Sequence, residues 1–282
     1  MIVLAENKYG KSRVRLVRVK RRDGWHHLHE WSLEIFLQGD FDGCFIEGDN
    51  SKILPTDTMK NTVYSLARDS SAECMEEFAK EVIDFLLRRN PQASSAEVSI
   101  EEKAWEHLQN GTNPHPTTFV QASGEIQTTK VTRTQTSDFS VGAGFENLII
   151  MKTSGSAFEG YIGDSLTTLP PSKDRLLGTS MRVNWDYARA VVAFTSLRGK
   201  IREILLSKFA AHQSKSVQHT LYAMGKAVLE EVAEVKDIEL TLPNKHCLLV
   251  DLSRFGQDNP NEIFVPVDEP HGNIQARLRR QE

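Results

Sequence analysis

The sequence predicts an α+β protein made of two tandem domains, each with a four-stranded antiparallel sheet and two helices on one face. Segments in which apolar and polar residues alternate, as in half-buried strands, follow one another across short turns, and this favours antiparallel pairing. A pair of amphipathic helical segments stands between the strands in each half of the chain. The order strand–strand–helix–helix–strand–strand therefore occurs twice, which is typical of an α+β architecture.

The first domain is expected over residues 1–136. Its elements are expected in this order: strands over residues 13–20 and 27–41, helices over residues 58–69 and 71–90, and strands over residues 96–107 and 117–135. The first strand, RVRLVRVK, alternates most clearly. In the second helix, apolar residues recur at helical spacing from Met75 to Leu86, and Asn90-Pro91 ends the run.

The second domain is expected over residues 137–282, and the two domains are expected to join near Thr134–Asp138. The elements predicted after this junction are strands over residues 139–156 and 180–195, helices over residues 196–213 and 216–235, and a strand over residues 237–253. The halves share the order of their elements but no evident residue identity. The repeat is therefore one of architecture.

Composition places the chain among ordinary globular proteins, because 39% of its residues are hydrophobic and 26% are charged. At 282 residues it is long enough for two domains, each with its own core. The net charge is −4, and the densest basic run, Lys20-Arg21-Arg22, is expected to be a solvated strand end. The sequence has no basic stripe, so no nucleic-acid partner is expected.

The three cysteines, Cys44, Cys74 and Cys247, stand far apart and form no CxxC pair. This spacing argues against a disulfide framework or a zinc ribbon and favours a reducing compartment. The first residues, MIVLAENKYGK, turn polar too soon for a signal peptide, and no segment approaches the roughly 20 apolar residues that span a bilayer. The last residues, RLRRQE, lack a peroxisomal signal. A cytoplasmic protein with no membrane partner is expected.

Familiar cofactor and metal motifs are absent from the sequence. GAGFEN, from Gly142, nearly matches a dinucleotide-binding loop, but it lacks the third glycine and lies in a strand-like stretch. His26, His27 and His29 are close together, but no carboxylate or cysteine stands at ligand spacing. A polar strand face is expected there, and no metal site.

The stretch LPTDTMKNTVY joins a loop to a helix. Any of Thr56, Asp57 and Thr58 could cap this helix, because a short side-chain oxygen can accept a bond from a free backbone N–H. An amine and an amide, Lys60 and Asn61, follow one turn later. A cap needs only one oxygen, so the stretch also contains groups that could take part in chemistry.

Other polar residues stand at the ends of predicted elements, where each has an ordinary structural explanation. Lys11 comes directly before the first strand and is expected to be solvated. Arg175, in TTLPPSKDRLLGT, is expected to form a surface ion pair with Asp174 or Asp164. Gln218 begins a helix.

The pair Asn244 and His246 lies in LPNKHC, which is expected to be a tight turn entering a strand. Conformational reasons alone explain Asn and Pro in such a turn. Taken singly, each of these polar residues favours a structural role. Their order along the chain is more specific than any one of them.

That order is defined by six stretches: NKYGKSRVRLVRV, TDTMKNTVY, FEGYIGDSLTTLPPSKDR, SVQHTLYAMG, LPNKH and FGQDNPNEIF. The series resembles the urate oxidases, or uricases, over essentially the whole chain. The resemblance implies two tunnelling-fold domains per chain and a homotetramer around a central tunnel, with active sites at subunit interfaces. It also implies a cofactor-free reaction of purine degradation, in which urate, O2 and water give 5-hydroxyisourate and hydrogen peroxide.

Carried over position by position, the resemblance implies a set of proton-handling residues and a set of substrate-binding residues. The implied catalytic residues are Lys11, Thr56 and His246. The implied substrate-binding residues are Thr56, Asp57, Phe158, Arg175, Val217, Gln218 and Asn244. In this assignment the Thr56 hydroxyl exchanges a proton with Lys11, Asp57 contacts the purine, and Thr58 or the backbone caps the helix.

Two alternatives stay open at this point. One is another tunnelling-fold enzyme acting on a pterin or a purine, which would also use Gln218; the Arg175 and Phe158 pair favours urate. The other is a non-catalytic urate-binding protein, which would have no use for a proton relay. Pro55 and Pro170-Pro171 depart from the usual sequence of the family, and the chain ends earlier than family members usually do.

Overall fold

The computed structural model describes residues 2–281, and each strand in it is hydrogen-bonded to the next strand along the chain. The elements are β1 (Tyr9–Arg22), β2 (Trp25–Gly39), α1 (Asp42–Glu47), α2 (Thr56–Asp69), α3 (Met75–Arg89), β3 (Ala93–Asn110), β4 (Asn113–Thr134), β5 (Ser140–Lys152), β6 (Leu177–Tyr187), α4 (Phe194–Ala211), α5 (Val217–Glu231), β7 (Val235–Leu249), a short 3₁₀ helix (Ser253–Phe255) and β8 (Phe264–Arg279). The predicted α+β architecture is confirmed.

The chain divides into two compact units. Unit 1 comprises Met1–Phe145 and Asp186–Leu197, and unit 2 comprises Glu146–Trp185 and Arg198–Glu282. The first division falls inside β5, nine residues after the predicted boundary between residues 136 and 137. The predicted domain limits stay a prediction.

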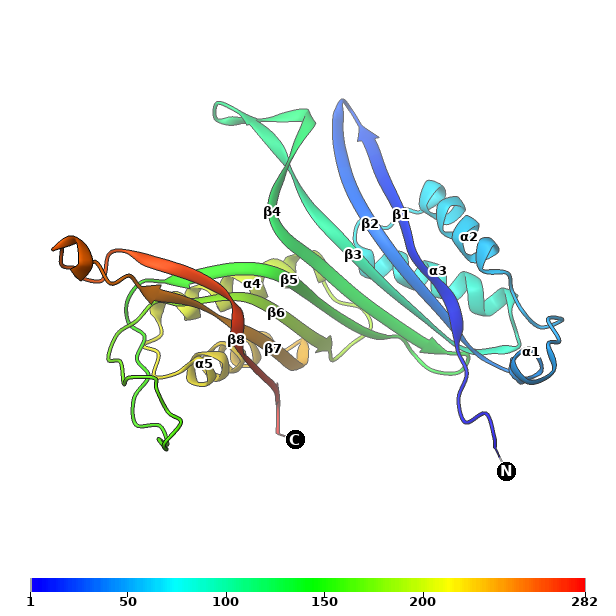
Figure 1. The fold of residues 1–282 in the computed structure, drawn as a ribbon. Coiled ribbons are helices and arrows are strands. Elements are labelled where there is room, and N and C mark those ends of the chain that lie inside the picture. Colours follow the sequence, from blue (N-terminus) through cyan, green and yellow to red (C-terminus); the bar gives the residue numbers. More distant parts are fainter. Residues whose placement is uncertain (1, 282) are drawn as a thin grey trace. The chain divides into compact units, whose positions relative to one another are not determined.

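In unit 1, strands β1 to β4 pair antiparallel in sequence order, and α2 and α3 cover one face of their sheet (Figure 1). One row across the sheet runs from Lys11 through Ile35 and Val98 to Val131. The last three side chains are fully buried, whereas Lys11 is half-buried. The candidate base therefore stands at the edge of a row that forms core further in.

The apolar face of helix α3 packs against the sheet of unit 1, as its sequence pattern predicts. Phe78 on its apolar face is fully buried and stacks on Trp31 of β2, with 5.1 Å between ring centroids. Burial of such a side chain stabilises the fold by about 1.5–3 kcal/mol. The helix ends where the sequence indicates, since the Asn90 side chain donates to the Leu86 carbonyl at 2.7 Å and covers a free end carbonyl.

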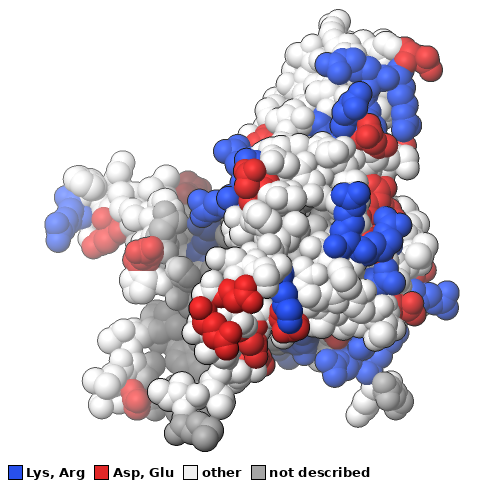
Figure 2. Space-filling view, turned by 90° about the vertical axis from the view of Figure 1, so that its right-hand side faces the viewer, with Lys and Arg blue, Asp and Glu red and all other residues white. Residues whose placement is uncertain are grey.

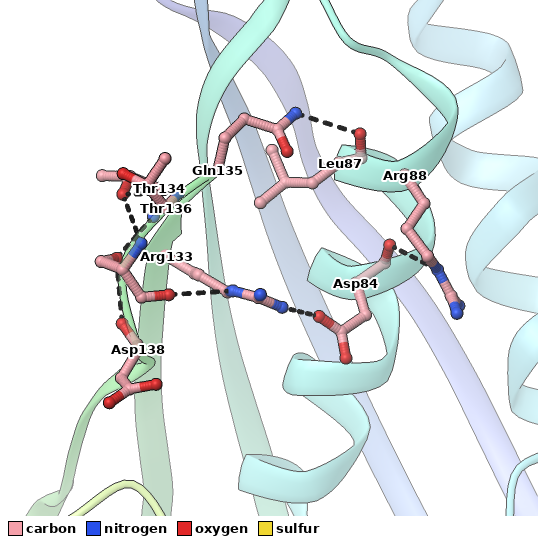
Figure 3. A network of polar contacts seen from close by, with 9 residues as sticks. Asp84, Leu87, Arg88, Arg133, Thr134, Gln135, Thr136 and Asp138 are labelled. Carbon is pink, nitrogen blue, oxygen red and sulfur yellow. Dashed lines mark hydrogen bonds and ion pairs between the residues drawn. The ribbon is translucent and has the colours of Figure 1, made fainter.

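The predicted junction near Thr134–Asp138 is the connection between β4 and β5, and polar contacts hold it to α3 (Figure 3). The Arg133 guanidinium binds the Asp84 carboxylate and donates from Nε to the Ser137 carbonyl at 3.2 Å. Gln135 Nε2 donates to the carbonyls of Leu87, at 3.1 Å, and Ala93, at 2.9 Å. The junction is thus fixed to unit 1.

In unit 2, α4 and α5 lie against the strands (Figure 1), and β7 pairs antiparallel with β8. Gly225 of α5 allows a close approach, because an added Cβ would lie 3.0 Å from Leu278 and 3.1 Å from Leu240. Leu221 and Met224 of the same helix are buried. The core of this unit therefore sits between α5 and the strands β7 and β8.

Several predicted boundaries need correction. The strand predicted over residues 180–195 ends at Tyr187, and α4 already begins at Phe194. The sequence reasoning named neither the short helix α1 nor the last strand, β8, although the repeated order requires a final strand. The β8 sequence contains Pro266, Pro270 and Gly272, which obscure its strand pattern.

Charges are mixed on the surface. On the face shown in Figure 2, basic side chains form separate groups with acidic side chains among them, as expected from the dispersed sequence. The predicted strand end at Lys20-Arg21-Arg22 is the end of β1, where Arg22 pairs with Glu73 at 2.9 Å. No helix among the described residues has both the length and the apolar character needed to cross a membrane.

Candidate active site

Lys11 is placed by an unusually close approach of β1 to β2. A Cβ on the preceding Gly10 would lie 1.7 Å from the Ile35 carbonyl oxygen, so only glycine fits there. A β-bulge follows between Lys11 and Val14, with Arg13 at a φ of 56°. Bulges redirect side chains and interrupt pairing. The Lys11 ammonium has no hydrogen-bond or ion-pair partner among the described residues, which leaves it available to a ligand.

Tyr9 connects this strand to the segment before α2. Its hydroxyl oxygen accepts a hydrogen bond from the backbone N–H of Leu54 at 2.8 Å. Its ring meets Phe41 edge to face, with centroids 4.8 Å apart. Burial raises the pKa of Tyr9 above its ordinary value of 10.0. These contacts hold the start of β1 beside the start of α2, and so hold Lys11 in the neighbourhood of Thr56.

Helix α2 begins at Thr56, and its N-cap residue is Pro55, with φ −56° and ψ 137°. The expectation that Thr56, Asp57 or Thr58 caps the helix is wrong, because no side chain caps it. Proline already holds a φ suited to this position, and its carbonyl accepts from the Met59 N–H at 3.2 Å. The Thr56 hydroxyl makes no hydrogen bond with the described residues.

The Asp57 carboxylate binds the amine of Lys60 and the amide of Asn61, which follow it one turn later in α2. Its carboxylate accepts from Lys60 Nζ at 2.6 Å and from Asn61 Nδ2 at 2.9 Å. The hydrogen bond from Lys60 is the main reason why the pKa of Asp57 lies below its ordinary value of 3.8, and the Lys60 charge, Asn61 and the Lys11 charge add to it. Lys60 and Asn61 thus favour the ionised form of Asp57, near the charge of Lys11.

In unit 2, Arg175 lies over the ring of Phe158, with 4.9 Å from the guanidinium carbon to the ring centroid. The expected ion pair of Arg175 with Asp174 or Asp164 does not form. Asp174 accepts from the Ser156 N–H, and Asp164 accepts from backbone and hydroxyl groups of its own loop. Burial lowers the pKa of Arg175, and its Nε is buried without a hydrogen-bond partner among the described residues.

Phe158 and Arg175 belong to two short segments that pair with each other. Phe158 and Ser172 exchange backbone hydrogen bonds of 2.7 and 2.9 Å, and the Arg175 N–H donates to the Ser156 carbonyl at 2.8 Å. We call residues 155–158 the clamp strand. On its other side, it pairs with Ser214.

Val217 and Gln218 form the start of α5, as predicted. Ser216 is the N-cap, and its hydroxyl oxygen accepts from the His219 N–H at 3.1 Å. Val217 is buried, whereas Gln218 is exposed. The first turn of a helix has free backbone N–H groups that favour anions. This end of α5 can therefore offer both amide donors and the Gln218 side chain to a ligand.

Asn244 and His246 lie inside β7, so the expectation of a tight turn at LPNKHC is wrong. Asn244 pairs with Gly272 of β8 and His246 with Val267, and the register shifts between them. A bulge of this kind accommodates the irregular sequence without ending the strand. Asn244 is buried, and His246 is half-buried.

The candidate residues are divided between the two units, and we call the residues that one unit contributes its cluster. The unit 1 cluster contains Lys11, Thr56 and Asp57; the unit 2 cluster contains Phe158, Arg175, Val217, Gln218, Asn244 and His246. Sequence reasoning missed the supporting roles of Tyr9, Ser156 and Ser214, and it expected Asp174 to pair with Arg175 when its carboxylate instead accepts from Ser156. Of these four residues, only Asp174 drew attention in the sequence, through its position beside Arg175.

The histidine run is a polar strand face with a carboxylate partner that the sequence did not reveal. His29 Nδ1 lies 2.6 Å from Glu102 Oε1, which also accepts from Trp31 Nε1 at 2.9 Å. Within residues 2–281, no group of three or more His, Cys, Asp or Glu side chains could hold a metal ion. Cys44, Cys74 and Cys247 are free thiols.

Two α+β units in tandem, each contributing one cluster of candidate residues, define a protein of the two-domain tunnelling fold. The family model described as Uricase matches residues 7–132 and 141–275. The chain belongs to the uricase family.

Individual relatives agree with this assignment. Uricase of Arthrobacter globiformis is 37% identical over 280 residues, which cover 99% of this chain and 91% of the relative. Uricase of Dictyostelium discoideum is 34% identical over 99% of this chain and 98% of the relative. The crystal structure of the Arthrobacter globiformis uricase matches with a TM-score of 0.95 over 100% of this chain and 96% of that chain.

Proposed function

We propose that this chain oxidises urate with O2 and water to 5-hydroxyisourate and hydrogen peroxide, without a cofactor, in purine degradation. The observation that carries the proposal is the buried, unpaired Nε of Arg175 beside the ring of Phe158. A buried donor without a partner is costly, so such a site is suited to a ligand that supplies an acceptor. Family membership makes urate that ligand.

Binding uses the shape and charge of the substrate. Urate is a flat purine anion with acceptors and donors on both edges. The Arg175 guanidinium is a planar fork of N–H donors that matches an O/N edge and offsets the negative charge. The Phe158 ring stacks on the purine face. Gln218 presents a donor and an acceptor in one plane, and the backbones of Val217 and Asp57 complete the recognition.

The chemistry needs proton control. Removal of a proton from urate raises its electron density, so that it can transfer two electrons to O2. Lys11 and the Thr56 hydroxyl handle that proton, and His246 relays or tunes it. Asn244 holds O2, peroxide or the attacking water above the ring. Urate, O2 and water then give 5-hydroxyisourate and hydrogen peroxide with all atoms and electrons balanced.

The assembly that fits this mechanism is a homotetramer with active sites at subunit interfaces. In it, the unit 1 cluster of one subunit meets the unit 2 cluster of a neighbouring subunit. The division of the candidate residues between two units supports such an arrangement. The dispersed free thiols support a cytoplasmic location.

The test is urate consumption by the purified protein in the presence of EDTA. We expect urate absorbance to fall at mildly alkaline pH, with one hydrogen peroxide released per urate, and a tetramer by light scattering. Unchanged absorbance from a folded tetramer would eliminate the oxidase function. Turnover of a pterin instead of urate would favour the other tunnelling-fold chemistry, and tight urate binding without turnover would favour a binding protein.

A further inference from the structure

Asp174 of unit 2 connects the chain segments of two proposed substrate-binding residues, Phe158 and Arg175. Its Oδ1 accepts the backbone N–H of Ser156 at 3.1 Å, and its own carbonyl accepts from the Ser172 hydroxyl at 2.8 Å. Ser156 is 1% exposed and lies in the clamp strand, two residues before Phe158. Arg175 follows Asp174 directly. The carboxylate thus adds a side-chain bond to the backbone bonds that join the segment with the guanidinium to the segment with the ring.

The connection continues to the start of α5. The Ala157 N–H donates to the Ser214 carbonyl at 2.8 Å, and the Ser214 N–H donates to the Gly155 carbonyl at 2.9 Å. The Ser214 hydroxyl donates to the Ser216 carbonyl at 3.0 Å and accepts from the Thr220 hydroxyl at 2.8 Å. A shift of the clamp strand would therefore also move the segment that leads into Val217 and Gln218.

The carboxylate of Asp174 acts on the backbone and not on the neighbouring guanidinium. The structure gives it no ion pair with Arg175, whose Nε lacks a partner among the described residues. Without an acceptor at position 174, the N–H of buried Ser156 would lose its hydrogen bond, and the clamp strand would relax to regain one. Such a relaxation changes the spacing between ring and guanidinium.

We propose that Asp174 is a positioning residue for the urate site, which fixes the Phe158 ring and the Arg175 guanidinium relative to each other through the Ser156 N–H. This inference rests on the proposed function. A displaced clamp strand weakens ground-state contacts with the purine. Loss of the Asp174 carboxylate is therefore expected to raise KM and to weaken ligand binding, with little change in kcat.

Three variants at position 174 distinguish the effect of the acceptor's position from the effect of the negative charge. Asp174→Ala removes both the acceptor and the charge. Asp174→Asn keeps an oxygen at the same distance but removes the charge, and Asp174→Glu keeps the charge but moves the acceptor by one methylene. The matched control is Asp251→Ala, because exposed Asp251 likewise accepts a backbone N–H, that of Ser253, at 2.9 Å.

The measurements are KM and kcat for urate, the Kd of xanthine as a non-oxidised purine probe, and thermal unfolding of the tetramer. We expect Asp174→Ala and Asp174→Glu to raise KM and the xanthine Kd by about three- to tenfold, with kcat within about twofold of the parent. Asp174→Asn and Asp251→Ala should stay within about twofold of the parent in all three values.

Parent-like affinity of Asp174→Ala in an active enzyme would overturn the positioning role. Equal losses in Asp174→Ala and Asp174→Asn would overturn it as well, because the charge would then matter and not the acceptor. If Asp174→Ala does not fold, Asp174→Glu against Asp174→Asn gives the same comparison. Failure of the parent chain to oxidise urate would refute the proposed function instead, and the xanthine Kd values distinguish the two failures.

Discussion

The guanidinium carbon of Arg175 lies 4.9 Å from the centroid of the Phe158 ring. This places a fixed positive charge beside an aromatic face within one unit, before any ligand is present. Tyr161 stacks on the same ring, with centroids 4.9 Å apart and planes 16° apart. Two neighbouring side chains therefore restrict the ring, which lowers the entropic cost of binding a flat anion.

Arg175→Ala is expected to reduce urate affinity more than it slows turnover. Loss of a bidentate, charge-assisted contact costs about 2–3 kcal/mol, which corresponds to a rise in KM of about 30- to 150-fold. The KM of Arg175→Lys should lie between those of the parent and of Arg175→Ala, since an ammonium keeps the charge but lacks the planar pair of N–H donors. Steady-state kinetics on urate measure this. Arg182→Ala, which removes a surface ion pair with Glu146, is the control and should leave KM unchanged.

Lys11→Ala and Thr56→Ala are expected to reduce kcat by about 100-fold or more, because general acid–base groups contribute about 10²–10⁴. The Kd of xanthine should change less than kcat in both variants, since Arg175 and Gln218 provide most of the contacts with the purine edges. Lys8→Ala removes a lysine that lies over the Phe36 ring at 4.6 Å and is the matched control. A loss of affinity as large as the loss of kcat would show that the roles are wrongly assigned.

Gly10→Ala is expected to destabilise the protein by about 2 kcal/mol or more, because the new methyl group would collide with the Ile35 carbonyl and force β1 away from β2. Lys11 would move with the strand, so activity should fall as well. Gly199→Ala in α4 is the variant for comparison. Nothing lies within 4 Å of its added Cβ, and alanine favours a helix over glycine by about 1 kcal/mol. Thermal unfolding should shift in opposite directions for the two variants.

His212 is expected to make the protein sensitive to acid. Burial, followed by the charges of His219, Lys208 and Lys152, lowers the pKa of His212 below its ordinary 6.5. The unfolded chain therefore binds a proton more readily, and stability should fall as the pH decreases through the unfolded value of 6.5 toward the lower folded value. Above 6.5 the group is neutral in both states and contributes no pH dependence.

The measurement is urea unfolding between about pH 7.5 and about pH 5.5, for the parent and for His212→Gln. The variant cannot be protonated at this position, so its midpoint should fall less steeply with acid. His212 Nε2 lies 3.2 Å from His219 Nδ1, so the variant also removes a hydrogen bond, and its midpoint at neutral pH serves as the reference. Equal slopes for both proteins would contradict the prediction.

Much of the fold could be predicted from local patterns. The apolar spacing of α3, its end at Asn90 and the beginning of a helix at Gln218, to within one residue, are confirmed, because each depends on neighbouring residues in the sequence. The motif series also predicted the family correctly. Those motifs combine rare residue types in a fixed order, so chance agreement over the whole chain is small.

The predictions that failed concern hydrogen-bond and strand-pairing partners that are distant in sequence. Asp174 binds Ser156 and not its neighbour Arg175, since pairing of the two segments brings the Ser156 N–H closer. Glu102 reaches His29 because β2 and β3 are adjacent, although the two residues are 73 positions apart. LPNKHC looked like a turn, but pairing with β8 carries β7 through it. Tertiary contacts decided these cases.

The separation of the candidate residues into a unit 1 cluster and a unit 2 cluster has a genetic consequence. In the proposed tetramer, a chain damaged at Lys11 still carries an intact Arg175, and the reverse holds for a chain damaged at Arg175. Two alleles that are each inactive alone would therefore complement each other when both chains are made in one cell, because mixed oligomers contain some sites assembled from two undamaged halves.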